Sequence, residues 1–314
     1  MVNVKYILVF VIVFALLLSL LYLHTHYSFD RECVDKYLLR EFLESQYVSE
    51  ISLLRAATFA SPDSSRIYVA SDNLLASRAL ATLNSPLSFK VLTTLNNKYG
   101  GGFDELHEVL LGVKIPDKFY CRYNEYLGNI STFKFGTLEI YYEKSNHNCI
   151  IEDWDRYADL VIYRALNSLL QGSRPYAEKL FERLMSMWDG YGFKDAAFNG
   201  KYATYKLALA IFLYRALEAA GSSKIMKYSN IINKCYEIID SMQRIDGGIV
   251  TDYEVSRGKV IPSGDANTET TSIVVLALYS NYPGKIGGNA RNKYTYPASI
   301  APLIQITPYM AFLA

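Results

Sequence analysis

The sequence predicts an all-α domain behind one N-terminal transmembrane helix. Apolar residues recur at helical spacing along most of residues 30–281, which is typical of amphipathic helices. A second set of helical segments has almost no polar face, so these helices should be buried on all sides. Residues 6–23 form an uncharged apolar run that precedes both sets. We therefore expect an anchor followed by a helical domain with a large apolar core.

The apolar run at residues 6–23 has the length of a membrane-spanning helix. At about 1.5 Å per residue it would extend about 27 Å, close to the hydrocarbon thickness of a bilayer. Residues 24–29 contain no small-x-small cleavage pattern, which favours an uncleaved signal anchor over a removed signal peptide. We expect residues 1–27 to form a single-pass anchor and residues 28–314 to form one domain outside the cytoplasm.

Two further features favour an oxidising compartment. Asn129-Ile130-Ser131 matches the acceptor pattern for N-glycosylation. Four cysteines could form two disulfides in any of three pairings, or could remain buried thiols. They are Cys33, Cys121, Cys149 and Cys235. Because none shows paired CxxC spacing, the sequence predicts no zinc site, and we expect no metal or other cofactor.

The charge of the domain argues against nucleic acid as a partner. Lys5 is the only base before residue 24, and the remaining bases equal the acids in number. Binding to a phosphate backbone relies on stripes of Lys and Arg, and no such stripe is present. The expected partners are therefore the membrane, through residues 6–23, and a glycan or a protein of the cell envelope.

The predicted helices alternate between two kinds along the chain. Amphipathic helices are expected at 31–59, 87–97, 175–188 and 224–243. Helices apolar on most or all sides are expected at 72–83, 153–171, 203–220 and 268–279. Connections from the buried to the amphipathic kind are tight, whereas those in the other direction are long and rich in Gly, aromatic and acidic residues. If the buried helices are parallel, the long loops share one rim, which is the usual place for function.

Two shorter segments interrupt the helical pattern. Residues 113–150 form the longest insertion, and their alternating apolar residues predict a small β-hairpin with Gly136-Thr137 near its turn. Gly100-Gly101-Gly102 lacks the context of a phosphate loop and is interpreted as a helix stop followed by a turn. The apolar segment 298–314 contains Pro302 and Pro308, which favour a docking strand or coil over a second span.

Two motifs suggest a more specific architecture. Gln243 to Gly248, with Asp246-Gly247-Gly248, resembles the turn that ends outer helices in α/α-toroid folds, and Asn267 to Thr271 resembles the polar start of an inner helix. These folds include six-hairpin glycosidases, polysaccharide lyases and terpenoid-cyclase barrels. The resemblance implies a toroid of alternating inner and outer helices, left incomplete because only about four hairpins are counted. Ile249 replaces the tryptophan usual in cyclases, which argues against isoprenoid chemistry.

The resemblance implies a domain that acts on or binds glycans in a groove at one rim. Hydrolysis, lysis and binding without catalysis all remain open, and whether the chain is an enzyme is left undecided. The alternative is a non-catalytic scaffold of the cell envelope, or a protein-interaction module that uses the same groove.

The candidate catalytic residues are acids of the predicted rim, because glycoside hydrolysis requires two carboxyl groups. They are Glu269, Asp265, Asp72 and Asp246, and the candidates for substrate binding are Tyr202, Tyr253, Asn73 and Phe193. A structural role is the alternative for each acid, because acids in a first helical turn complement the helix dipole. The domain's two histidines, His107 and His147, show no adjacent carboxylate pattern, which argues against a metal site or a Ser-His-Asp triad.

Overall fold

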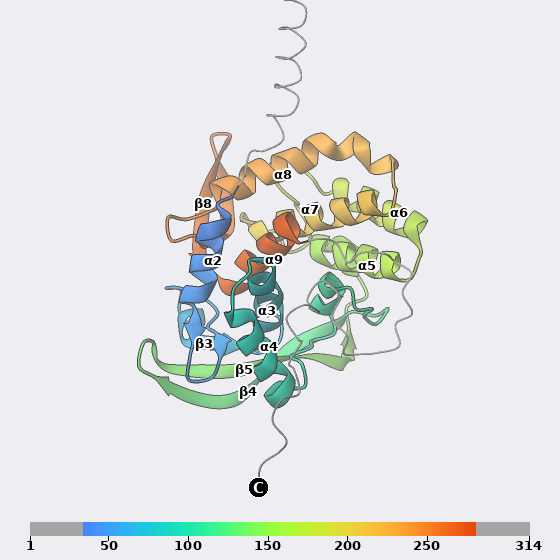
Figure 1. Ribbon diagram of the computed structural model, residues 1–314. Helices are drawn as coiled ribbons and strands as arrows, with labels where there is room; N and C mark the ends of the chain where they lie inside the picture. The colour runs from blue at the N-terminus through green and yellow to red at the C-terminus, as the bar shows by residue number, and fades with distance from the viewer. Residues whose placement is uncertain (1–33, 281–314) are drawn as a thin grey trace, which may run out of the picture. The chain divides into compact units, whose positions relative to one another are not determined.

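The computed structural model describes residues 34–280, which contain eight α-helices and four short 3-10 helices (Figure 1). The α-helices are α2 (Lys36–Ser45), α3 (Asp72–Thr82), α4 (Leu87–Tyr99), α5 (Ala158–Leu170), α6 (Arg174–Met185), α7 (Thr204–Ala219), α8 (Ser229–Ser241) and α9 (Thr268–Tyr279). The 3-10 helices are η1 (Asp63–Ser65), η2 (His107–Leu111), η3 (Trp154–Arg156) and η4 (Lys224–Tyr228).

Several predictions concern residues outside this range. The anchor at 1–27, Cys33 and the segment 298–314 all lie outside the described residues. Among the helices of residues 34–280, none has the length and apolar character needed to cross a bilayer.

The prediction of an all-α toroid with one small hairpin is wrong, because the described residues also form three β-sheets. The strands are β1 (Tyr47–Val48), β2 (Leu53–Leu54), β3 (Arg66–Tyr68), β4 (Tyr120–Thr132), β5 (Gly136–Ile150), β6 (Tyr202–Ala203), β7 (Val250–Ser256) and β8 (Lys259–Ala266). The sheets have the strand orders β1-β2, β3-β5-β4 and β6-β7-β8. The fold is therefore a mixed one of helices and sheets.

Four helices form the interior of the fold. α3 packs against α9, α9 against α7, and α7 against α5, while α4, α6 and α8 lie against the outer sides of this row (Figure 1). Composition explains the difference, because α7 buries twelve of its sixteen residues whereas α8 buries only four of thirteen. A helix that is apolar on all sides is stable when other elements surround it, because burial removes its apolar surface from water and leaves few polar groups without solvent.

The sheet β3-β5-β4 contains the longest strands of the described residues. β4 and β5 form a long antiparallel hairpin, and β3 pairs with β5 in parallel. Successive side chains of a strand point to opposite faces, so Leu138 and Ile140 are buried against the helices while Glu139 and Tyr141 lie on the other face. The outer face is thus free to carry polar and aromatic residues.

A disulfide joins the two ends of this hairpin. Cys121 at the start of β4 is bonded to Cys149 near the end of β5. Cys235 is a buried free thiol. The structure therefore contains one of the disulfides that the sequence allows, Cys121–Cys149.

Asn73 connects the start of α3 to two strands. Its side chain is fully buried, accepts a hydrogen bond from the backbone N–H of Leu54 at 2.7 Å, and donates to the carbonyls of Leu54 at 2.9 Å and Tyr68 at 2.6 Å. Buried backbone groups require such partners. Asn73, expected from the sequence to bind substrate, thus has a structural function.

We expect Asn73→Ala to lower the free energy of unfolding by at least about 2 kcal/mol, because it leaves three buried backbone groups without a partner. Urea unfolding followed by circular dichroism measures the change. The control is Asn124→Ala on the exposed part of β4, which should change the free energy by less than about 0.5 kcal/mol. Equal effects of the two substitutions would contradict the assigned function.

Candidate active site

Ionisable side chains gather where the N-terminal ends of α3 and α9 approach β4, β5 and η2. We call this set the acid cluster. It consists of Asp72, Asp104, His107, Glu108, Arg122, Glu143 and Glu269. Asp, Glu and Arg are almost never buried without partners, so a buried group of five acids and two bases requires an explanation.

A glycine turn brings Asp104 into the cluster. Gly100, Gly101 and Gly102 all have positive φ, and Gly100 ends α4 in the left-handed conformation, which confirms the predicted helix stop. A side chain at Gly102 would collide with Leu95. The chain then reverses into Asp104, whose Oδ1 accepts hydrogen bonds from the backbone N–H groups that lead into η2.

His107 lies between two carboxylates. Its Nδ1 is 2.6 Å from Oδ2 of Asp104, and its Nε2 is 3.3 Å from Oε1 of Glu269. The ring of Tyr163 packs edge-on against the imidazole at 5.6 Å between centroids. Burial opposes the charged imidazole, but the charge and hydrogen bond of Asp104 outweigh it and raise the pKa of His107 to about 10. His107 is therefore an imidazolium at neutral pH.

Arg122 connects the hairpin to the same carboxylate. Its NH2 group lies 2.6 Å from Oδ2 of Asp104 and 3.6 Å from Oε1 of Glu143. Glu143 also accepts a hydrogen bond from the hydroxyl of Ser71. Although burial favours a neutral Asp104, the adjacent cations His107 and Arg122 hold the pKa of this carboxyl far below its usual range.

Asp72 and Glu269 differ in protonation although both begin buried helices. Burial, together with the negative charges of Glu269 and Glu143, raises the pKa of Asp72 well above its usual value. For Glu269, burial acts in the same direction, but the hydrogen bond and charge of His107 outweigh it and lower the pKa. Asp72 is only 4% exposed, whereas the Glu269 side chain is 34% exposed. The cluster thus combines a buried neutral acid with a carboxylate that solvent can reach.

The backbone is strained beside Asp72. Ser71 has φ 40° and ψ −84°, which is a rare conformation for a residue other than glycine. It links β3 to α3 and places its hydroxyl on Glu143. Strain of this kind is found most often at functional sites, where the surrounding structure maintains it.

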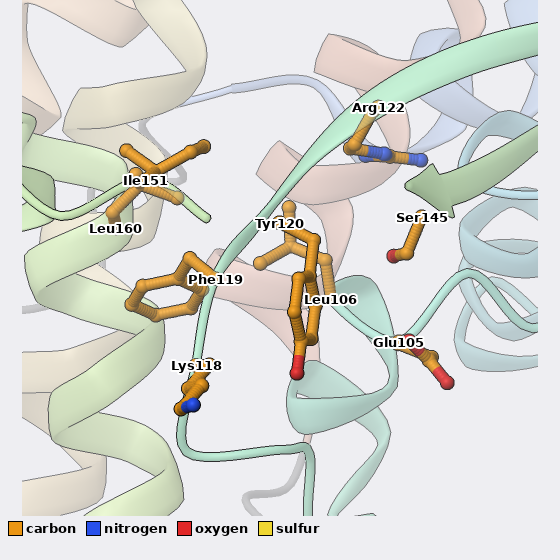
Figure 2. A pocket seen from close by; sticks show the side chains of 9 residues that line it. All are labelled: Glu105, Leu106, Lys118, Phe119, Tyr120, Arg122, Ser145, Ile151 and Leu160. Atoms are coloured by element: carbon orange, nitrogen blue, oxygen red, sulfur yellow. The ribbon is translucent and has the colours of Figure 1, made fainter. Parts of the chain in front are cut away.

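A cavity of about 260 Å³ adjoins the cluster through Arg122 (Figure 2). Figure 2 shows Phe119, Ile151 and Leu160 at one side of the cavity, Arg122, Ser145 and Glu105 at the other, and Tyr120 between them. Leu106 and Lys118 complete the lining. The cavity therefore offers an apolar wall and a polar wall, an arrangement common in sites for small molecules.

The structure separates the four acids predicted from the sequence into two pairs. Asp72 and Glu269 belong to the acid cluster. Asp265 instead binds Arg244 at 2.9 Å, and Arg244 also binds Asp246 at 3.1 Å. Oδ2 of Asp265 accepts hydrogen bonds from three consecutive backbone N–H groups of residues 58–60. These contacts explain Asp265 as the anchor of a loop.

The aromatic residues predicted to bind substrate are buried. Tyr202 stacks on Tyr253 with 5.2 Å between ring centroids, and the hydroxyl of Tyr202 donates to Asp189. Phe193 packs edge-on against Trp188. All three rings fill space inside the protein and contribute to its core.

Sequence reasoning missed His107, Arg122 and Glu143. Asp104, three residues before His107, was the available signal, because an aspartate that caps a turn can also reach a side chain three residues later. Arg122 and Glu143 join the cluster only through the pairing of β4 with β5. Within residues 34–280, no group of three or more His, Cys, Asp or Glu side chains has the geometry to hold a metal ion.

Comparisons with models of protein families, with curated proteins and with solved structures gave no match.

The charge on His107 predicts a loss of stability at alkaline pH. Below pH 6.5, the usual pKa of histidine, its contribution is fully present, and it is lost as the pH rises toward the folded-state pKa of about 10. We expect the free energy of unfolding to fall across this window, and His107→Gln to make the fall shallower. Urea unfolding at pH 6, 8 and 10 provides the measurement. Equal pH slopes for the parent and the variant would contradict the assignment.

Proposed function

We propose that the domain is a glycoside hydrolase outside the cytoplasm, with Asp72 as its general acid and Glu269 as the second carboxylate. The observation that carries the proposal is the placement of these two side chains in the first turns of packed helices α3 and α9, where they interact electrostatically and His107 is bound to Glu269. Their opposite pKa shifts support it, because glycoside hydrolysis uses one protonated and one ionised carboxyl group.

The proposed roles follow from the environments of the two groups. Asp72 would donate its proton to the glycosidic oxygen as the bond from that oxygen to the anomeric carbon breaks. Glu269 would either attack the anomeric carbon, to be released later by water, or remove a proton from a water that attacks directly. In both cases water supplies the new hydroxyl at the anomeric carbon, and the leaving sugar keeps the proton from Asp72. The second proton of the water restores protonated Asp72, directly when Glu269 has formed the covalent bond and through Glu269 and solvent when it has not. His107 would keep Glu269 ionised and oriented.

The location outside the cytoplasm is part of the proposal. Disulfides persist in oxidising compartments, and Cys121–Cys149 lies in the strand pair that carries Arg122 and Glu143. This bond supports placing the domain beyond the membrane anchor predicted at residues 6–23. Polysaccharides of the cell surface would be accessible to a domain in that position.

We expect Asp72→Asn and Glu269→Gln each to lower the release of reducing ends from a cleaved polysaccharide by about 100-fold or more, because each removes one of the two required carboxyl groups. The assay compares the parent and the variants on a panel of polysaccharides, and circular dichroism checks folding. Asp153→Asn, at a carboxylate on the surface, is the control and should keep the parent's activity.

Absence of cleavage by a folded parent on every polysaccharide would overturn hydrolysis. An ultraviolet assay for unsaturated products would then test lysis. Failure of both assays would favour the envelope scaffold as the function of the domain.

A further inference from the structure

Three tyrosines form a row across the outer face of the sheet β3-β5-β4. Tyr68 on β3 lies beside Tyr141 on β5, with 6.0 Å between ring centroids, and Tyr126 on β4 lies on the other side of Tyr141 at 5.6 Å. The strand register places Tyr141 opposite both of the others. Tyr126 is 52% exposed, and the other two rings are partly exposed. We call these three residues the tyrosine row.

The tyrosine row is continuous with the acid cluster. Tyr141 and Glu143 are two residues apart on β5, so they share one face of the sheet at about 7 Å spacing along the strand. Tyr142 points the opposite way and donates its hydroxyl to the carbonyl of Tyr99. The row crosses the strands, whereas Glu143 follows Tyr141 along β5, so a molecule lying on the row would lie beside Glu143, which accepts a hydrogen bond from Ser71 at the start of α3.

Carboxylates bind the hydroxyls of Tyr68 and Tyr141, and a guanidinium lies over the ring of Tyr141. The Arg66 guanidinium lies 5.0 Å from the centroid of Tyr141, whose hydroxyl donates to Glu139 at 2.8 Å. The hydroxyl of Tyr68 donates to Asp63 at 3.0 Å. A pyranose ring presents C–H groups on its faces and hydroxyls around its edge, and therefore matches exposed aromatic rings bordered by carboxylates. A purely apolar partner would leave these charges without compensation.

The charges near the row also restrict the sugar. Asp63 and Glu139 contribute two negative charges, and Arg66 contributes one positive charge. The excess of negative charge disfavours chains of uronic acids or sulfated sugars and is compatible with an uncharged chain.

We propose that Tyr68, Tyr141 and Tyr126 bind consecutive sugar rings of an uncharged polysaccharide beside the acid cluster. This inference rests on the proposed glycoside hydrolysis and adds a substrate class to it. It also implies a preference for long chains, since a disaccharide is too short to contact all three rings.

Affinity for oligosaccharides of different length tests the proposal. Isothermal titration of the full-length protein, in its Asp72→Asn form to prevent cleavage, would use disaccharides and hexasaccharides of glucan, mannan and xylan, with oligogalacturonate as the charged probe. We expect binding of at least one uncharged hexasaccharide. Tyr126→Ala and Tyr141→Ala should each weaken it by about 10-fold, as stacking on one ring contributes of the order of 1 kcal/mol.

Tyr123→Ala is the matched control. Tyr123 is 49% exposed on the same strand as Tyr126, but it pairs with Lys144, whose side chain lies on the opposite face from Tyr141. This substitution should leave the affinity unchanged. Tyr126→Phe keeps the ring and should retain binding, which separates stacking from any effect on folding.

The outcomes distinguish sugar binding by the tyrosine row from hydrolysis by Asp72 and Glu269. Hexasaccharide binding that depends on Tyr126 and Tyr141, without cleavage by the parent, would support the row and overturn the hydrolysis. If the parent cleaves the polysaccharide and neither alanine substitution changes the affinity, the sugar-binding role of the tyrosine row would be overturned. The catalytic roles proposed for Asp72 and Glu269 would be unaffected. Tighter binding of oligogalacturonate than of every uncharged chain would overturn the substrate class.

Discussion

Asp104 and His107 share a 2.6 Å hydrogen bond inside the protein, and the charges of the site follow from it. An isolated imidazolium in such a position would lose its proton, because burial disfavours the charged form. Asp104 prevents this and is itself held ionised by His107 and Arg122. The imidazolium in turn keeps Glu269 ionised at the first turn of α9. Without this hydrogen bond, Glu269 would have no buried cation in direct contact, and the difference between the two proposed catalytic carboxyls would disappear.

The position of Asp72 has the opposite consequence. No cation is in contact with its carboxyl among the ion pairs of residues 34–280, and its hydroxyl neighbour Ser71 also serves Glu143. Burial and the charges of Glu143 and Glu269 therefore act together to keep Asp72 protonated. One cluster thus contains a protonated and an ionised carboxyl group, because both cations, His107 and Arg122, bind Asp104 and neither binds Asp72.

Most of the helices, and the acids in the first turns of α3 and α9, could be predicted from the sequence, but the helix expected at 31–59 is wrong beyond Ser45, where α2 ends and β1 and β2 follow. The composition of a helix such as α7, which is apolar on all sides, is enough to indicate that the helix is buried. An acid in the first turn of such a helix is therefore easily recognised in the sequence. The hairpin of β7 and β8 was not predicted, although the sequence contains two signals for it. These are the β-favouring residues Val250, Tyr253 and Val255 and the glycine at Gly258, and in the structure Arg257 and Gly258 form the turn with positive φ. The place of His107 in the site could not be predicted from the sequence, because its second carboxylate, Glu269, belongs to a distant helix that only the tertiary fold brings near.

The error in fold class and the omission of site residues have the same origin. An all-α domain would have to build its site from loops at the ends of helices, which is why the sequence directed attention to Asp265 and Asp246. In the folded chain, one half of the site comes from helices, as Asp72 and Glu269 do, and the other half comes from the long hairpin that carries Arg122 and Glu143. Unlike the end of a helix, a strand pair presents a flat face on which several residues lie in register. Two tyrosines of the row also lie on that face, so the hairpin that the all-α prediction treated as an insertion carries both these proposed sugar-binding rings and two residues of the acid cluster.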